Sequence, residues 1–271
     1  MIRFILGRLV KAVFILLAIL VFNFLLIHAA PGDPAAVMDG EAGAADEKFL
    51  LDLRARFGLD QPLYMQLWLY IKGAVQLDLG YSFRQQMSVA EMIGDRLPAT
   101  LLLTGVAFVL SLVLGVTAGV AASARQGRWG DTIISTFALL FYATPLFWVA
   151  LMATLVFSVW LEWLPGFGYS TIGAGYTGMA HVLDVAKHLV LPASTLGLFF
   201  MAIYMRMTRA SMLEVSRLDF VKTARAKGLK HGIIQRRHIL RNALLPVITL
   251  AGLQAGQIFG GAILTETVFA W

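Results

Sequence analysis

The chain has 271 residues, of which 59% are hydrophobic and only 14% are charged, with a formal net charge of +6. This composition excludes an ordinary soluble domain and indicates an integral membrane protein. The sequence contains no cysteine, which excludes disulfides, thiolate metal sites and a cysteine nucleophile.

Five apolar stretches are long enough to cross roughly 30 Å of hydrocarbon. In chain order they cover residues 12–30, 99–122, 133–161, 189–205 and 243–264. Pro145, Pro192 and Pro246 fall inside or at the start of three of these stretches, where we expect simple helix kinks. We interpret the first stretch as a retained span, because the Pro-rich sequence after it is a poor signal-peptide cleavage site.

The charges are distributed unevenly between the two sides of these spans. Arg3, Arg8 and Lys11 precede the first span, and residues 206–241 contain ten Lys or Arg against two acids. Residues 31–98 instead contain ten acids against six bases. Because cytoplasmic segments are enriched in Lys and Arg, the basic ends are expected in the cytoplasm and residues 31–98 outside.

The predicted organisation has three parts. Residues 1–30 form an N-terminal region with the first span, residues 31–98 form an extracytoplasmic segment, and residues 99–271 form the core with a cytoplasmic loop at 206–242. About seventy residues are too many for a structureless link.

Two helices are therefore expected in the extracytoplasmic segment. One covers residues 44–57, and the other covers residues 63–75 and suits the membrane surface because it carries aromatic residues.

A short helix is predicted in the basic loop, between Asp219 as the N-cap and Gly228 as a left-handed terminator. Phe220, Val221 and Ala224 fall on one side of this helix. Such a narrow apolar strip suits docking into a groove on another protein.

The sequence Thr-Ala-Arg-Ala-Lys-Gly at 223–228 resembles the cytoplasmic coupling loop of ABC importer permeases, in the variant carried by peptide and nickel importers. Three other segments resemble hallmarks of the first permease subunit of dipeptide and oligopeptide importers, and a fourth segment adds to the family resemblance. The three are Pro-Gly-Asp-Pro (31–34), Gly-Leu-Asp-Gln-Pro-Leu (58–63) and Leu-Asp-Leu-Gly-Tyr-Ser (77–82), and the fourth is Thr-Arg-Ala-Ser (208–211). Together these motifs extend over nearly the whole chain.

The resemblance implies an all-α permease of the type I ABC importer fold, forming half of a pore for peptides or related small solutes in the bacterial inner membrane. The implied partners are a second permease subunit, two ATPase subunits, an extracytoplasmic solute-binding protein and membrane lipid. Permeases of this family continue into a sixth span, so we expect the chain to lack a segment that follows Trp271 in the family.

The resemblance also implies which residues contact the ATPase. Asp219 would cap the coupling helix, the apolar strip would enter a cleft of the ATPase, and two cations would pair with acids at its rim. The expected contact residues are Asp219, Phe220, Val221, Thr223, Ala224, Arg225, Ala226, Lys227, Gly228 and Leu229.

The sequence contains no motif for catalysis of its own. There is no Gly-x-x-x-x-Gly-Lys-Ser/Thr and no His-Glu-x-x-His, and the five histidines have no ligand-like spacing. We therefore expect a transport subunit that is not an enzyme, holds no metal or cofactor, and depends on partners that use ATP. Nothing in the basic loop resembles a nucleic-acid-binding fold.

Gln254 and Gln257 are candidates for lining a solute path, since they lie one helical turn apart in a glycine-rich span. The alternative, close helix packing through small residues with the amides bonding across helices, is favoured at this stage.

Other functions remain open. A nickel-chelate or opine importer of the same family would share these motifs. A secondary transporter or channel would carry charged residues or broken helices at the midplane, and a membrane scaffold would leave the outward motifs unexplained.

The orientation predicts a labelling pattern. Gly40→Cys should react with an impermeant maleimide in intact cells, because residue 40 is expected outside, whereas Lys230→Cys should not react. Labelling of Lys230→Cys from outside would overturn the topology.

Overall fold

The computed structural model describes residues 2–29, 61–82 and 85–271, and the predicted helix at 44–57 lies outside these residues. The chain divides into two compact units, residues 1–96 and 97–271, and each is described by itself.

In the first unit, α1 (Ile2–Ala29) and α4 (Leu63–Val75) contact each other, and β1 (Tyr81–Ser82) pairs antiparallel with β2 (Met87–Ser88). His28 Nε2 and Gln66 Oε1 lie 2.9 Å apart. The rings of Phe24 and Tyr70 are 5.9 Å apart between centroids. The predicted helix at 63–75 is confirmed.

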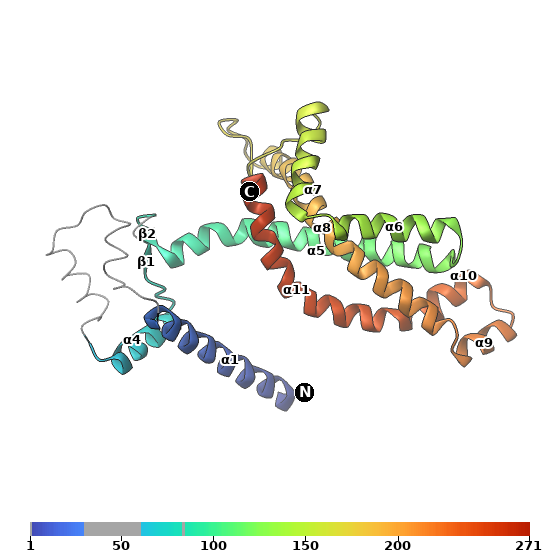
Figure 1. Ribbon diagram of the computed structural model, residues 1–271, viewed down its shortest axis with the longest axis horizontal. Helices are drawn as coiled ribbons and strands as arrows, with labels where there is room; N and C mark the ends of the chain where they lie inside the picture. Colours follow the sequence, from blue (N-terminus) through green and yellow to red (C-terminus); the bar gives the residue numbers. More distant parts are fainter. Residues whose placement is uncertain (1, 30–60, 83–84) are drawn as a thin grey trace. The chain divides into compact units, whose positions relative to one another are not determined.

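The second unit is entirely helical among the described residues that have regular structure (Figure 1). Its elements are α5 (Val89–Ala124, which begins before the unit boundary), α6 (Trp129–Ala143), α7 (Leu146–Thr154), the π-helix η1 (Leu155–Trp160), α8 (Met179–Val215), α9 (Asp219–Ala226), α10 (His231–Ile233), the π-helix η2 (Ile234–Leu240) and α11 (Arg241–Phe269).

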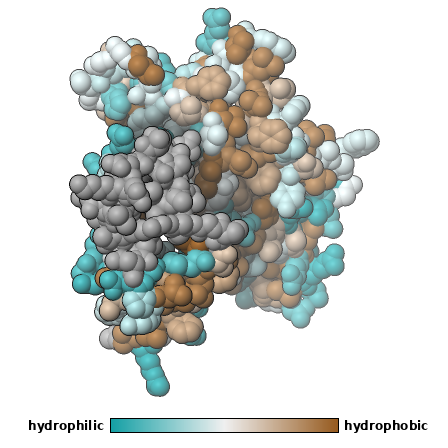
Figure 2. Space-filling view, turned by 60° about the vertical axis from the view of Figure 1, so that its left-hand side comes forward, coloured by the Kyte–Doolittle hydropathy of each residue, from teal (hydrophilic) through white to brown (hydrophobic). Residues whose placement is uncertain are grey.

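In the described part of the chain, four helices are long and apolar enough to cross a membrane, or five if one bent pair counts as a span. Apolar side chains such as Phe14 (73% exposed) and Leu253 (72% exposed) reach the surface, and apolar patches are visible in Figure 2. A surface of this kind is expected to contact lipid or other subunits.

The stretch predicted as one span at 133–161 is broken. Helix α6 ends at Ala143, α7 begins at Leu146, and their axes differ by 101°. Thr144 is extended (φ −85°, ψ 136°) because proline disfavours a helical conformation in the residue before it. The expectation of a simple kink at Pro145 is therefore wrong, whereas Pro192 and Pro246 do lie inside continuous helices.

Helix α8 lies at the centre of the second unit, since 72% of an 18-residue apolar segment of this helix is buried. It packs against α5, α6, α7 and α11. The main core cluster joins α5, α8 and α11 through a set that includes Leu103, Ala107, Leu196, Tyr204, Val247 and Ile258.

The end of α11 packs near the start of the apolar part of α5. Trp271 Nε1 donates a hydrogen bond to the Ala99 carbonyl at 3.0 Å, and the ring of Trp271 lies 5.0 Å from that of Tyr169. The Gly168 N–H donates to the Phe269 carbonyl at 2.8 Å. The loop between η1 and α8 is thereby fixed to this end of the unit.

Two glycines let α5 approach α8 closely. A Cβ added at Gly115 would lie 2.5 Å from Tyr204 Cβ and 2.8 Å from the Met201 carbonyl oxygen. A Cβ at Gly119 would lie 2.7 Å from the Met205 carbonyl oxygen. The contact is therefore backbone against backbone and cannot be relieved by a rotamer change.

Gly115→Ala should destabilise the protein by about 1–3 kcal/mol, as overpacking of a close contact does. Gly105→Ala on the same helix is the matched control, because nothing lies within 4 Å of its added Cβ. The measurement is the free energy of unfolding in detergent, and equal values for the two variants would contradict the close α5–α8 contact.

Candidate functional site

The predicted helix in the basic loop is present as α9, which lies beyond the end of α8 in Figure 1. It ends as predicted: Gly228 has φ +73°, its N–H donates to the Arg225 carbonyl at 2.9 Å, and the Leu229 N–H donates to the Ala224 carbonyl at 3.4 Å. These two bonds form a Schellman motif, which satisfies carbonyls at the helix end.

The sequence predicts Asp219 as the N-cap, but the N-cap in the structure is Leu218. The backbone of Leu218 is extended (φ −69°, ψ 151°), and this residue makes no side-chain cap hydrogen bond. Asp219 is the first helical residue, and its Oδ1 accepts a hydrogen bond from Lys222 Nζ at 2.8 Å. The carboxylate still lies at the positive end of the helix dipole, where a negative charge is favourable.

Part of the apolar strip faces inward. Val221 is fully buried and Ala224 is 4% exposed, in a cluster with Met212 of α8 and with Ile234 and Ile239 of η2. The prediction that these two residues are free to enter a partner's cleft is therefore wrong. An eight-residue helix is marginal by itself, so its apolar residues pack against its own chain.

Other predicted contact residues are accessible. Phe220 is 40% exposed and Leu229 is 38% exposed, two apolar side chains at opposite ends of the α9 segment. The remaining accessible positions are Asp219, Thr223, Arg225, Ala226, Lys227 and Gly228. A partner approaching α9 would therefore meet cations and threonine between two apolar side chains.

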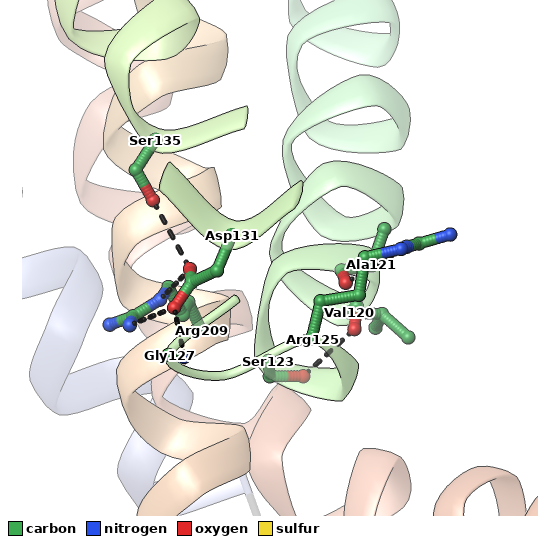
Figure 3. Close-up of polar contacts among 8 residues, drawn as sticks. All are labelled: Val120, Ala121, Ser123, Arg125, Gly127, Asp131, Ser135 and Arg209. Atoms are coloured by element: carbon green, nitrogen blue, oxygen red, sulfur yellow. Dashed lines mark hydrogen bonds and ion pairs between the residues drawn. The ribbon is translucent and has the colours of Figure 1, made fainter. Parts of the chain in front are cut away.

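An ion pair joins the start of α6 to α8 (Figure 3). Arg209 Nε donates to Asp131 Oδ1 and Arg209 Nη2 donates to Asp131 Oδ2, both at 2.7 Å. The Gly127 N–H and the Ser135 hydroxyl also donate to this carboxylate, at 3.2 and 3.4 Å. Asp131 is 5% exposed, so the carboxylate is buried with most of its acceptor sites used.

The ion pair lies one helical turn from the contact with α9. Arg209 precedes Met212 by three residues on α8, and Met212 packs in the cluster that holds α9. The end of α8 is thus attached to α6 through charge and to α9 through apolar contact. Asp131 was not among the candidate residues from the sequence. The available signal was a single acid directly before the apolar stretch at 133–161, in a chain whose Thr-Arg-Ala-Ser motif supplies Arg209.

The candidate pathway residues lie in different environments. Gln254 is 8% exposed and faces the core, whereas Gln257 is exposed. Added Cβ atoms at Gly252, Gly256 and Gly260 would have nothing within 4 Å. These three glycines therefore mediate no helix packing within the described chain, and a role for the two glutamines in a solute path stays a prediction.

No group of three or more His, Asp or Glu side chains is arranged to hold a metal ion in the part of the chain that the structure describes.

Comparison with known families decides the class of protein. The family model "Binding-protein-dependent transport system inner membrane component" matches residues 88–271, and the N-terminal model of the same transport system matches residues 1–104. The chain belongs to this family. It is accordingly an inner-membrane permease of the ABC importer type, with the fold that this family shares.

Two relatives of this permease illustrate the similarity. It is 38% identical to the dipeptide transport system permease protein DppB of Alkalihalophilus pseudofirmus, over 100% of this chain and 85% of the relative. It is 39% identical to the glutathione transport system permease protein GsiC of Escherichia coli K12, over 100% of this chain and 83% of the relative.

Among solved structures, an amino acid ABC transporter with histidines matches with a TM-score of 0.43 at 15% identity, covering 63% of this chain and 68% of the other. This likeness is too weak to carry an argument.

Two ion pairs of the permease should differ in their contribution to stability. Asp131→Asn removes the negative charge from a buried ion pair that is joined by two hydrogen bonds. It should lower the free energy of unfolding by about 2 kcal/mol, a value typical of hydrogen bonds to charged groups. Lys222→Gln breaks an exposed pair of similar length, 2.8 Å, and should cost less than about 1 kcal/mol. Unfolding in detergent measures both, and an equal loss would contradict the anchoring role of Asp131.

Proposed function

We propose that this permease forms half of a translocation pathway for small peptides or related solutes, with glutathione-like peptides included. The solute class is supported by the relatives, which are named as dipeptide and glutathione permeases at 38% and 39% identity. Their names favour a peptide over a nickel chelate or an opine. Family membership also separates the chain from secondary transporters and membrane scaffolds.

The proposed partners are a second permease subunit, two ATPase subunits and an extracytoplasmic solute-binding protein. The single observation that carries the coupling role is α9: a short helix with an exposed cationic surface, held on a buried apolar base. Separate ATPases would bind and hydrolyse the ATP, and α9 would be their contact.

The proposed mechanism follows from how α9 is attached. Val221 and Ala224 pack on α8 through Met212 and on η2 through Ile234 and Ile239. Since η2 continues directly into α11, a displacement of α9 by closing ATPases would act on α8 and α11 together. Movement of these two helices would alternately open the pathway toward the binding protein and toward the cytoplasm.

The inward position of Ala224 changes which substitution tests this role. Ala224→Glu would bury an unpaired carboxylate inside the permease itself and would destabilise the chain before any partner binds. An informative substitution must instead lie on the exposed surface of α9, where folding is spared.

Phe220→Glu should weaken ATPase binding at least about tenfold, because an exposed aromatic anchor is replaced by a carboxylate. Ile172→Glu is the matched control, an apolar-to-acid change at a residue that is 98% exposed in the loop before α8. The measurements are ATPase co-purification and solute-stimulated ATP hydrolysis in proteoliposomes. If Phe220→Glu leaves both at the level of the control, α9 does not couple ATP hydrolysis to transport.

A further inference from the structure

A cavity of about 780 Å³ lies between the last turns of α5 and the segment formed by α10 and η2. Its volume is within the roughly 300–1,000 Å³ of typical ligand pockets. The residues that line it are Val116, Thr117, Val120, Ala121, Ala124, Lys230, Gly232, Ile233, Gln235, Arg236, Arg237 and Leu240. It is separate from the exposed residues of α9 proposed to meet the ATPase.

The two walls of the cavity differ in chemistry. The α5 wall is apolar apart from one threonine, with Val116, Val120 and Ala121 among its members. The opposite wall carries three cations, Lys230, Arg236 and Arg237. No Asp or Glu lines the cavity, so its charge is wholly positive.

These cations have no partner of opposite charge within the described chain. The ion pairs there join Arg209 to Asp131, Lys222 to Asp219 and His188 to Asp184. Lys230, Arg236 and Arg237 belong to none of them and are exposed. Three unpaired cations that converge on one cavity would attract an anion strongly.

The cavity lies at the boundary of the apolar spans. Val116 to Ala124 are the last turns of α5, and η2 leads directly into the apolar helix α11. This end of the unit carries the basic loop that the charge distribution assigns to the cytoplasm. Anionic headgroups of the inner leaflet would lie at this depth, and basic pockets between spans on this side bind such headgroups.

We propose that the cavity binds an anionic phospholipid of the inner leaflet. The phosphate contacts Arg236, Arg237 and Lys230, and one acyl chain lies along the apolar α5 wall. A free phosphate would use only the cationic wall, and a neutral lipid only the apolar wall. The π-helical geometry of η2, which carries both arginines, is of a kind frequent at functional sites.

Native mass spectrometry of the full chain in detergent tests the proposal, with phosphatidylglycerol and phosphatidylcholine of identical acyl chains. One phosphatidylglycerol should bind at least about tenfold more tightly than phosphatidylcholine. The double variant Arg236→Gln, Arg237→Gln should lower the affinity for phosphatidylglycerol about tenfold or more, since each cation contributes near an anionic surface, and should leave phosphatidylcholine unchanged.

Two further variants separate the cavity from general charge attraction. Arg217→Gln with Lys227→Gln removes two exposed cations outside the cavity and should leave the affinity unchanged. Ala121→Trp fills the apolar wall while keeping every cation, and should also weaken phosphatidylglycerol binding.

Several outcomes would overturn the proposal. An equal loss of affinity for phosphatidylglycerol in the two double variants would show that the lipid responds to net charge and not to the cavity. Displacement of the lipid by millimolar inorganic phosphate would indicate a free-anion site. Loss of the bound lipid whenever a second permease subunit co-purifies would show that a protein occupies the cavity.

Discussion

The backbone-to-backbone approach of α5 and α8 is the constraint on which the second unit depends. In a membrane, burial of apolar surface gives little drive for helices to associate, because lipid is as apolar as a leucine side chain. Close packing has to supply the attraction, and Gly115 and Gly119 allow it by leaving no side chain between the helices. Helix α8 is consequently the most buried span and supports α6, α7 and α11.

Helix α9, the proposed contact with the ATPase, has an inner and an outer side with different roles. A helix of eight residues is marginally stable by itself, and the buried side chains of Val221 and Ala224 stabilise it by packing against the rest of the chain. Its outer surface remains polar and cationic, with Phe220 and Leu229 partly exposed. Because the inner contacts reach both α8 and η2, a force on the outer surface is delivered to two helices of the core.

Charge is used differently in the Asp131–Arg209 pair and in the cavity beside η2. Asp131 and Arg209 neutralise each other in a buried pair that joins α6 to α8. Arg236 and Arg237 remain unpaired within the described chain and face an apolar wall. The first arrangement holds the helices together, whereas the second leaves positive charge available for the proposed phospholipid.

The motifs of the sequence determined the family of the protein through their resemblance to known permeases. Local composition and the glycine at position 228 determined the apolar stretches apart from the broken one at 133–161, the helix at 63–75, and the ends of α9 to within one residue. Leu218 rather than Asp219 precedes the helix, and the 101° break at Thr144 and Pro145 has a local cause, since proline disfavours a helical conformation in the residue before it. Tertiary structure alone decided that Val221 and Ala224 face inward. It also decided that Asp131 meets Arg209. These features depend on contacts between residues far apart in the chain, and periodicity along one helix cannot show which of its faces the rest of the chain will cover.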